Sequence, residues 1–199
     1  CAAARDGDVI PVFIRDESVD DLGGAPKWRL GLGLAQLEAQ VKALRGAVVM
    51  RSGAARDVLL QLVQETGATS VYWSRLYDAQ AIARDTDVKA CLAAKGIDAR
   101  SFDGHLLFEP WSVETKQGGF YKVYTPFWNA VKQRQIEPSL GLPELRFAAS
   151  VPSESLENWH LGAAMQRGAD VVLPHTVVGE TAAQDRLDHF IKTHVDQYK

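Results

Sequence analysis

The sequence predicts an α/β fold with a Rossmann-like parallel sheet and helices on both faces of that sheet. Short, unbroken apolar runs alternate with longer stretches of helical periodicity between residues 9 and 103. The apolar runs have the length of strands that are buried on both faces. Their order, strand then helix then strand, is typical of right-handed βαβ units. A hydrophobic content of 46% over 199 residues is enough for a substantial core.

The first predicted elements are a strand and a long helix. The run VIPVFI, residues 9–14, is rich in β-branched residues and too short for a helix, although Pro11 removes one ladder donor. A helix follows because five apolar residues recur with spacings of 4, 3, 4 and 3, which places them on one face. These residues are Leu30, Leu34, Leu37, Val41 and Leu44.

The next pair of elements repeats this order. Residues 47–50 (AVVM) form the second predicted strand, and residues 52–67 the second helix, with Ser52 as N-cap and Gly67 after the last turn. Residues 69–73 (TSVYW) form the third strand. The following helix spans residues 78–95 and ends at Gly96. Its inward residues are expected to be Ile82, Val88, Cys91 and Leu92. Residues 97–103 supply a weaker fourth strand.

The pattern divides the chain into three parts. Residues 1–135 form the predicted α/β domain, residues 136–178 an irregular connecting segment, and residues 179–199 a terminal helix. The connecting segment begins with a stretch rich in proline and serine that has no sustained period. The chain starts at Cys1 in what resembles the last turn of a helix, and the terminal helix has an uncovered apolar face. We therefore expect a chain that is cut at both ends.

Composition and charge exclude several classes of function. A formal charge of −3 and a pI near 6.0 are unfavourable for binding a phosphate backbone, so nucleic acid is not expected as a partner of this chain alone. Cys1 and Cys91 have no metal-type spacing and are expected to be free thiols, as in a reducing compartment. There is no apolar run of membrane-spanning length and no signal peptide. The expected location is the cytoplasm, without membrane contact.

The sequence contains no catalytic motif of a known spacing. It has neither a phosphate-binding loop nor G-x-G-x-x-G, because Gly31 and Gly33 lie within the leucine-striped helix. No serine lies in a G-x-S-x-G turn. No metal site is expected, because the histidines do not recur at ligand spacing. They are His105, His160, His175, His189 and His194.

The carboxyl edge of the predicted sheet is the place where a ligand is expected. In parallel α/β sheets, ligands bind beyond the carboxyl ends of the strands, near the point where the topology reverses. The segments that follow the strands are residues 14–16, 52–53, 73–78 and 103–105.

Five ordered blocks resemble the amino-terminal half of the DNA photolyases and cryptochromes, and in particular bacterial cyclobutane pyrimidine dimer photolyases. They are VIPVFIRDE, VYWSRLYDAQAIARDTDVKACLAAKGI, FDGHLLFEPWSV, GGFYKVYTPFWNAV and VGETAAQDRLDHFI. The resemblance implies an antenna domain whose central first strand lies before Cys1, or is replaced by a strand from another copy in a strand-exchanged oligomer. It also implies a helical FAD-binding domain after Lys199, which would contact damaged DNA. Catalytic residues are then expected outside this chain.

The resemblance further implies an antenna pigment, which could be a folate, a deazaflavin or a flavin, at the carboxyl edge of the sheet. A planar pigment needs a stacking surface and a few oriented polar groups. Where some folate-binding members have an Asn-Glu pair, this chain has Ala79 and Gln80, which weakens the case for folate. The residues that the resemblance assigns to the pigment are Phe13, Ile14, Asp16, Leu22, Lys27, Trp73, Arg75, Tyr77, Asp78 and Gln80.

The aromatic stretch FYKVYTPFWNAV, residues 120–131, has two interpretations. The one we favour is that its rings anchor the last helix of the domain to the sheet and to the connecting segment, as buried aromatic residues usually do. The alternative is an interface with the FAD-binding domain, since Tyr and Trp suit surfaces that are partly apolar and partly wet. The residues of that interface would be Tyr121, Tyr124, Phe127 and Trp128.

Two functions follow from the resemblance, and a third is independent of it. The first is the light-harvesting domain of a DNA photolyase, a lyase that splits pyrimidine dimers with light-excited FAD. The second is the same domain of a cryptochrome photoreceptor. The third is an unrelated nucleotide-binding α/β module. Cys1 to Lys199 alone are expected to carry out no bond chemistry.

Overall fold

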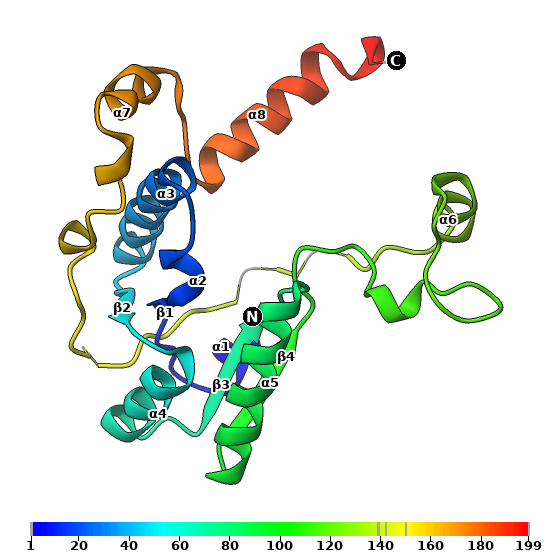
Figure 1. The fold of residues 1–199 in the computed structure, drawn as a ribbon. Helices are drawn as coiled ribbons and strands as arrows, with labels where there is room; N and C mark the ends of the chain where they lie inside the picture. Colours follow the sequence, from blue (N-terminus) through cyan, green and yellow to red (C-terminus); the bar gives the residue numbers. More distant parts are fainter. Residues whose placement is uncertain (1, 139, 142, 150, 199) are drawn as a thin grey trace. The chain divides into compact units, whose positions relative to one another are not determined.

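The computed structural model describes residues 2–138, 140–141, 143–149 and 151–198, and these form two compact units (Figure 1). Unit 1 comprises Cys1–Asp6 and Gly67–Glu144, and unit 2 comprises Gly7–Thr66 and Leu145–Lys199. Each unit contains a two-stranded parallel sheet with its own helices, as the sequence predicts for an α/β fold. No helix in the described part of the chain is long and apolar enough to cross a membrane.

Unit 2 is built on strands β1 (Val12–Arg15) and β2 (Val49–Ser52), in which Phe13 lies opposite Met50. The first strand begins three residues later than predicted, after Pro11. Pro11 has no backbone N–H to donate, but its carbonyl accepts a hydrogen bond from Val49 N–H at 2.8 Å. Pro11 thus contributes to the pairing with β2 as an acceptor. Val9 pairs instead with Phe147.

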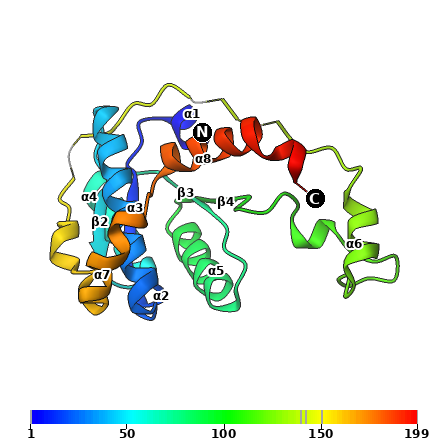
Figure 2. The same cartoon turned by 90° about the horizontal axis from the view of Figure 1, so that it is seen from above.

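Helices cover both faces of this sheet (Figures 1 and 2). They are α2 (Glu17–Asp20) and α3 (Gly24–Ala43) on one face and α4 (Ala55–Thr66) on the other. Met50, fully buried, packs in the cluster that contains Leu34 and Val41 of α3, whereas its neighbour Val49 packs with Val58 of α4. Successive strand residues point to opposite faces, so this alternation places one core on each side of the sheet.

Two predictions for unit 2 are wrong in detail. Ser52 does not cap α4, because it is the last residue of β2 and α4 begins at Ala55. The leucine stripe of α3 is only partly covered, since Leu37 is 41% exposed and Leu44, which follows the helix, is 56% exposed. The sheet has only two described strands and is too small to cover the full length of a 20-residue helix.

The connecting segment packs on unit 2 and contributes to its core. Met50 N–H donates to Ser153 Oγ at 2.8 Å, and Glu154 N–H donates to the Met50 carbonyl at 2.9 Å. Trp159 and Leu161 are buried in the same cluster as Met50. The segment contains η2 (Leu156–Trp159), η3 (Ala163–Met165), α7 (Arg167–Val172) and η4 (Leu173–His175).

The terminal helix is present as α8 (Glu180–Thr193), followed by η5 (Val195–Gln197). None of the residues of α8 is buried. Leu187 is 51% exposed and Ile191 is 52% exposed, so the apolar face predicted from the sequence has no cover within the described residues.

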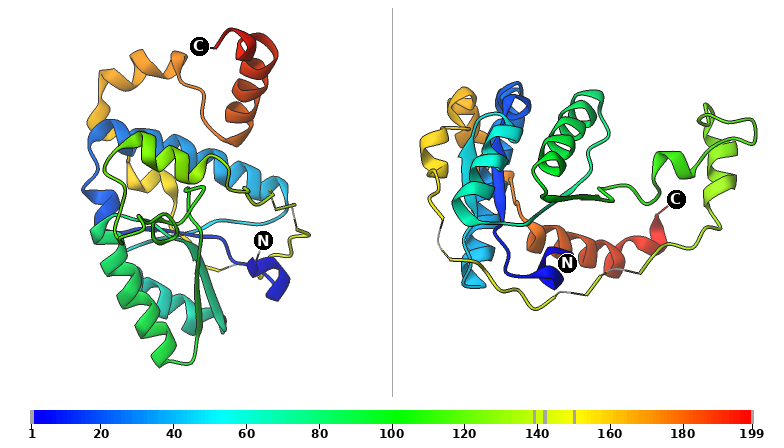
Figure 3. Two further views of the ribbon diagram at one scale, coloured as in Figure 1. Left: turned by 90° about the vertical axis from the view of Figure 1, so that its right-hand side faces the viewer. Right: turned by 90° about the horizontal axis from the view of Figure 1, so that it is seen from below.

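Unit 1 contains α1 (Ala2–Asp6), which confirms the predicted short helix, and strands β3 (Ser70–Ser74) and β4 (Asp98–Phe102). Tyr72 lies opposite Arg100 in the parallel pairing. Figure 3 shows α5 (Ala79–Ala94) beside these strands. The Tyr72 hydroxyl donates to the carboxylate of Asp6, which connects α1 to β3. Cys91 is a free thiol, as predicted, and Cys1 lies outside the described residues.

The ends of α5 confirm the sequence prediction, and part of its inner face does not. Asp78 is the N-cap, since its carboxylate accepts from Ala81 N–H at 2.8 Å, and Gly96 has the positive φ of 74° expected after a helix. Ala81, Val88 and Leu92 are buried. Ile82, expected to face inward, is 52% exposed because Ala81 takes that position at the start of the helix.

Candidate functional site

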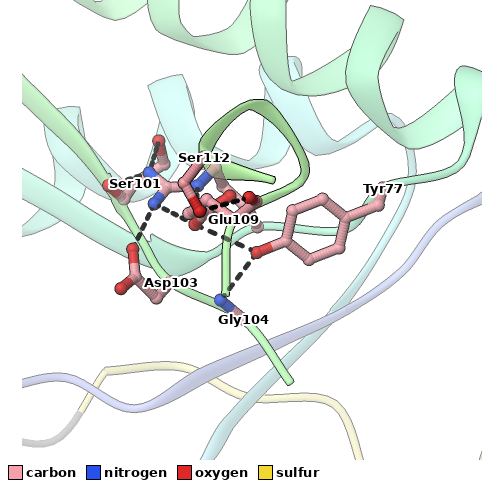
Figure 4. Close-up of polar contacts among 7 residues, drawn as sticks. Tyr77, Ser101, Asp103, Gly104, Glu109 and Ser112 are labelled. Atoms are coloured by element: carbon pink, nitrogen blue, oxygen red, sulfur yellow. Dashed lines mark hydrogen bonds and ion pairs between the residues drawn. The ribbon is translucent and has the colours of Figure 1, made fainter. Parts of the chain in front are cut away.

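A polar cluster centred on Arg75 lies at the carboxyl ends of β3 and β4. Figure 4 shows its partners Ser101, Asp103 and Glu109. Arg75 directly follows β3, and its backbone N–H donates to the Phe102 carbonyl at 2.9 Å, which extends the parallel ladder. Its side chain therefore starts at the edge where the sequence predicts a ligand.

Arg75 uses all of its guanidinium nitrogens within this cluster. Nη1 donates to the Ser101 carbonyl at 2.7 Å and to Ser101 Oγ at 3.2 Å. Nη2 donates to Asp103 Oδ1 at 2.5 Å, and Nε and Nη2 both donate to Glu109 Oε1, at 3.1 and 2.6 Å. A planar guanidinium with five donors in a fixed arrangement is suited to holding several acceptors at once.

Glu109 is the main acceptor, and its side chain is only 13% exposed. The Tyr77 hydroxyl donates to the same carboxylate oxygen at 3.1 Å. Partial burial acts to raise the pKa of Glu109, but hydrogen bonds from Arg75 and Tyr77 outweigh it, and the pKa lies below its ordinary value. The hydrogen bond from Arg75 to Glu109 likewise raises the pKa of the guanidinium. Both groups are therefore charged at neutral pH.

The cluster fixes the path of the chain after β4. Gly104 N–H donates to the Tyr77 hydroxyl at 3.2 Å, and a Cβ at Gly104 would lie 2.2 Å from the Arg75 carbonyl oxygen. The Tyr77 ring contacts the edge of His105, with centroids 5.8 Å apart. The Arg75 guanidinium lies 5.5 Å from the centre of the Trp111 ring, in η1 (Pro110–Ser112). Residues 103–111 are thus folded back over the ends of β3 and β4.

Trp73, predicted to stack on a pigment, has a local partner. Its indole N–H donates to Asp85 Oδ2 of α5 at 2.9 Å, and the residue is half-buried. Asp85 also accepts from Arg84 Nη2 at 2.8 Å. The arrangement connects β3 to α5, which supports a packing role for Trp73. Gln80, in the first turn of α5, is exposed.

The predicted pigment residues of unit 2 lie around the end of β1. Phe13 packs against Trp159, with ring centroids 6.0 Å apart, and Ile14 packs with the cluster that includes Val58. Asp16 caps α2 by accepting from Ser18 N–H at 3.1 Å. Lys27 Nζ donates to the Asp20 carbonyl at 2.5 Å. Leu22, by contrast, is 37% exposed.

A second polar cluster in unit 2 includes a residue of the predicted edge. Ser52 N–H and Oγ donate to the two carboxylate oxygens of Glu154, at 2.7 and 2.6 Å, and Trp159 Nε1 donates to Glu154 Oε2 at 2.7 Å. Burial acts to raise the pKa of Glu154, but these hydrogen bonds outweigh it and lower the pKa. The cluster attaches the connecting segment to the end of β2.

The structure therefore brings together Arg75 and Tyr77, and separately the residues around the end of β1. Glu109, Glu154 and Trp159 were not among the residues predicted from the sequence. Glu109 lies in the block FDGHLLFEPWSV, where a carboxylate just before a proline and a tryptophan was a usable signal. No comparable local signal marks Glu154, because its partner Ser52 is 102 residues away. No group of three or more metal-ligating side chains occurs among the residues that the structure describes.

The aromatic stretch does not pack as the favoured interpretation predicts. In α6 (Tyr124–Val131) only Val131 is buried. Phe120 is 75% exposed, Tyr124 is 70% exposed and Trp128 is 47% exposed. These rings do not anchor the helix to the sheet, so the packing interpretation is wrong for this part of the described chain.

Comparison with known proteins identifies the family. A family model described as DNA photolyase matches residues 1–145. The chain belongs to the DNA photolyase family. It is 41% identical over 194 residues to the deoxyribodipyrimidine photo-lyase of Agrobacterium fabrum. The match covers 96% of this chain and 40% of that protein. Cryptochrome-2 of Arabidopsis thaliana is 31% identical over 172 residues, covering 79% of this chain and 28% of the plant protein.

Solved structures of this family agree with the fold. The crystal structure of a bacterial class III photolyase from Agrobacterium tumefaciens matches with a TM-score of 0.85 and 40% identity, covering 96% of this chain and 41% of that one. An archaeal photolyase from Sulfolobus tokodaii, solved with two FAD molecules, has the same fold with a TM-score of 0.65 and 19% identity. The chain thus spans about two fifths of the length of the Agrobacterium photolyases and corresponds to their amino-terminal part.

Proposed function

We propose that these 199 residues are the light-harvesting, amino-terminal part of a DNA photolyase that splits pyrimidine dimers. The observation that carries the proposal is the 41% identity to the Agrobacterium fabrum photolyase along 96% of this chain. The light-driven step would belong to FAD bound in the remainder of the full-length protein, which would also contact damaged DNA. The proposed location is the cytoplasm.

The chain would bind an antenna pigment. The residues predicted to bind it divide into two groups, according to whether their side chains are free to contact a pigment. The polar groups of Trp73, Arg75 and Asp78 are bound by neighbouring residues. Arg75 and Asp78 therefore support the edge, and Trp73 keeps only its half-buried ring for a pigment. Leu22 and Gln80 have exposed side chains, and the Lys27 ammonium has two further donors beyond its bond to Asp20. Considered separately, unit 1 offers Gln80 and the ring of Trp73 for pigment contact, and unit 2 offers Leu22 and Lys27. Folate, deazaflavin and flavin all remain compatible with this set, which offers one apolar surface and a few polar groups.

The test is repair of thymine-dimer DNA by the full-length protein under near-ultraviolet light. The full-length protein with reduced FAD is expected to restore thymines, and the 199-residue chain by itself is expected to restore none, because the cofactor performs the chemistry. An absorption spectrum of the purified full-length protein identifies the pigment. Repair by the isolated chain would show that the chemistry has been assigned to the wrong part of the protein.

A cryptochrome is the second candidate, and the 31% identity to Arabidopsis cryptochrome-2 favours it over other photoreceptors. A cryptochrome would undergo flavin photoreduction in the same experiment but leave the dimers intact. Membership of the photolyase family excludes the third candidate, an unrelated nucleotide-binding module.

A further inference from the structure

Five rings on α6 and in the segment before it are exposed, and we call this set the aromatic surface. Its members are 37–75% exposed, and large exposed apolar patches usually mark interaction sites. The members of the aromatic surface are Trp111, Phe120, Tyr124, Phe127 and Trp128.

Contacts within unit 1 hold several of these rings in fixed positions. The rings of Tyr124 and Trp128, one turn apart on α6, are nearly parallel, with centroids 6.4 Å apart and an interplanar angle of 6°. The Arg134 guanidinium, just after α6, lies 5.6 Å from the Phe108 ring centre and donates to Ser112 Oγ at 3.4 Å. This contact connects the end of α6 to η1, where Trp111 lies over Arg75. The surface is therefore partly ordered before any partner binds.

Basic side chains lie in the same segment of the chain as the aromatic surface. Residues 110–136 carry Lys116, Lys122, Lys132 and Arg134 against the single acidic residue Glu114, a formal charge of +3 in a chain whose total is −3. All four basic side chains are exposed. Exposed aromatic rings with Arg at the edge are typical of protein interfaces, and a charged rim selects a partner of the opposite sign.

We propose that the aromatic surface docks against the remainder of the full-length photolyase, on a face that carries apolar and acidic side chains. This inference rests on the proposed function, because the partner it names is the rest of a full-length photolyase. The match covers 40% of the Agrobacterium fabrum protein, so about 60% of a protein of that length would be available to form the partner face. A nucleic-acid partner fits less well, since the aliphatic residues Val123 and Ile136 of the same segment are 63% and 56% exposed. Such side chains gain from apolar burial but offer bases no stacking surface.

Hydroxyl-radical footprinting tests the occupant directly. The full-length protein and the 199-residue chain are labelled under the same dose, and modification of Tyr124 and Trp128 is measured by mass spectrometry. We expect labelling of both residues to fall roughly fivefold or more in the full-length protein, because a docked interface core excludes water. Leu44 of unit 2, 56% exposed, serves as the reference. Equal labelling in the two proteins, or equal protection of Leu44, would overturn the inference.

A double variant separates docking from folding. Tyr124→Ser with Trp128→Ser is expected to lower the melting temperature of the full-length protein and to leave that of the 199-residue chain unchanged, since both rings are exposed in the chain. Val177→Ser, at a residue that is 76% exposed in unit 2, is the matched control. A loss of stability in both proteins would show that the rings serve the fold of this chain. No loss in either would show that they dock nowhere, and both results would overturn the inference.

Other occupants give distinct results. Protection in the 199-residue chain that grows with its concentration would indicate a second copy, and protection only after addition of single-stranded DNA would indicate nucleic acid. Either result would replace the proposed occupant. Dimer repair is measured on the same samples: repair with an unprotected surface would reject the docking alone, whereas protection without repair would reject the proposed activity alone.

Discussion

The guanidinium of Arg75 and the carboxylate of Glu109 lie 2.6 Å apart, although 34 residues separate them in the sequence. Arg75 directly follows β3 at the carboxyl edge of the sheet. Glu109 lies in residues 103–111, the segment that folds back over this edge. Arg75 also donates hydrogen bonds to Ser101 and Asp103, where this segment begins. One side chain therefore binds the start of the segment and Glu109 near its end. The contact also lies beside Trp111 of the aromatic surface, whose ring centre is 5.5 Å from the Arg75 guanidinium.

Arg75→Lys tests this contact. Lysine keeps the positive charge but cannot hold acceptors in several directions, because its ammonium is a single point of contact. We expect faster hydrogen exchange at Gly104, whose N–H donates to Tyr77, and faster proteolysis within residues 103–111. Arg51→Lys, which alters an ion pair with Glu65 in unit 2, is the control. Unchanged exchange at Gly104 would mean that the segment is held without Arg75.

Gly104→Ala is expected to destabilise unit 1. The added Cβ would lie 2.2 Å from the Arg75 carbonyl, a backbone atom that cannot move without breaking the sheet edge. Overpacking of this kind costs about 1–3 kcal/mol. Gly33→Ala is the matched control, because Gly33 lies inside α3 with no atom within 4 Å of the added Cβ. That substitution should stabilise the protein by about 0.5–1 kcal/mol. Urea denaturation measures both, and shifts of the same sign would contradict the prediction.

Glu109→Gln is expected to change how stability depends on pH. The folded-state pKa of Glu109 lies below its unfolded value of about 4.3, so the unfolded chain takes up the proton first as the pH falls. The carboxylate therefore stabilises the fold at neutral pH, and this contribution disappears as the pH falls through the folded-state pKa. The difference in urea midpoint between wild type and variant should be largest near pH 7 and shrink below about pH 4. Glu114→Gln, at an exposed glutamate, is the control variant.

Substitutions of Trp73 separate packing from pigment binding. Trp73→Phe removes the hydrogen bond to Asp85 and should cost about 1 kcal/mol of stability while keeping an aromatic ring. Trp73→Ala removes the ring as well, and in the full-length protein it should weaken pigment retention about tenfold without affecting repair by FAD alone. Near-ultraviolet absorption and the light-dose dependence of repair measure the two effects. Normal pigment content in Trp73→Ala would assign the ring to packing, and loss of flavin would indicate a damaged fold.

The outer edge of β1 is expected to pair with another strand in the full-length protein. The carbonyls of Pro11 and Arg15 accept from β2 and from the residue after it, so by alternation the backbone groups of Val12 and Ile14 point to the opposite edge. No strand pairs there among the described residues, and β1 and β3 are not paired with each other. In the 199-residue chain, the amides of Val12 and Ile14 should exchange about tenfold faster than those of Phe13 and Arg15.

In the full-length protein this difference should disappear, because an unpaired strand edge acquires a partner. Strand exchange between copies of the 199-residue chain would also protect the edge. Sedimentation analysis distinguishes that case, since protection would then depend on chain concentration. Equal exchange of all four amides in a monomeric 199-residue chain would contradict the prediction.

The sequence by itself determined the order of the strands and helices and several of their ends. Apolar runs located β1 to β4 within a few residues, and Asp78, Gly67 and Gly96 marked helix ends correctly. These features depend on interactions between residues that are close in the chain, and the periodicity of the apolar residues records them. The five resemblance blocks, also local patterns, pointed to the family to which the chain belongs.

Only the tertiary structure decided which side chains meet and which remain exposed. The pairing of Arg75 with Glu109, and that of Ser52 with Glu154, depend on where the chain returns after leaving the sheet, and no local pattern encodes that path. The same reason explains the error at Ile82: its spacing fits an inner face, but in the folded chain Ala81 is buried and Ile82 is exposed. Exposure of an aromatic residue such as Tyr124 is likewise set by what packs on it, because one ring can fill a core or an interface equally well.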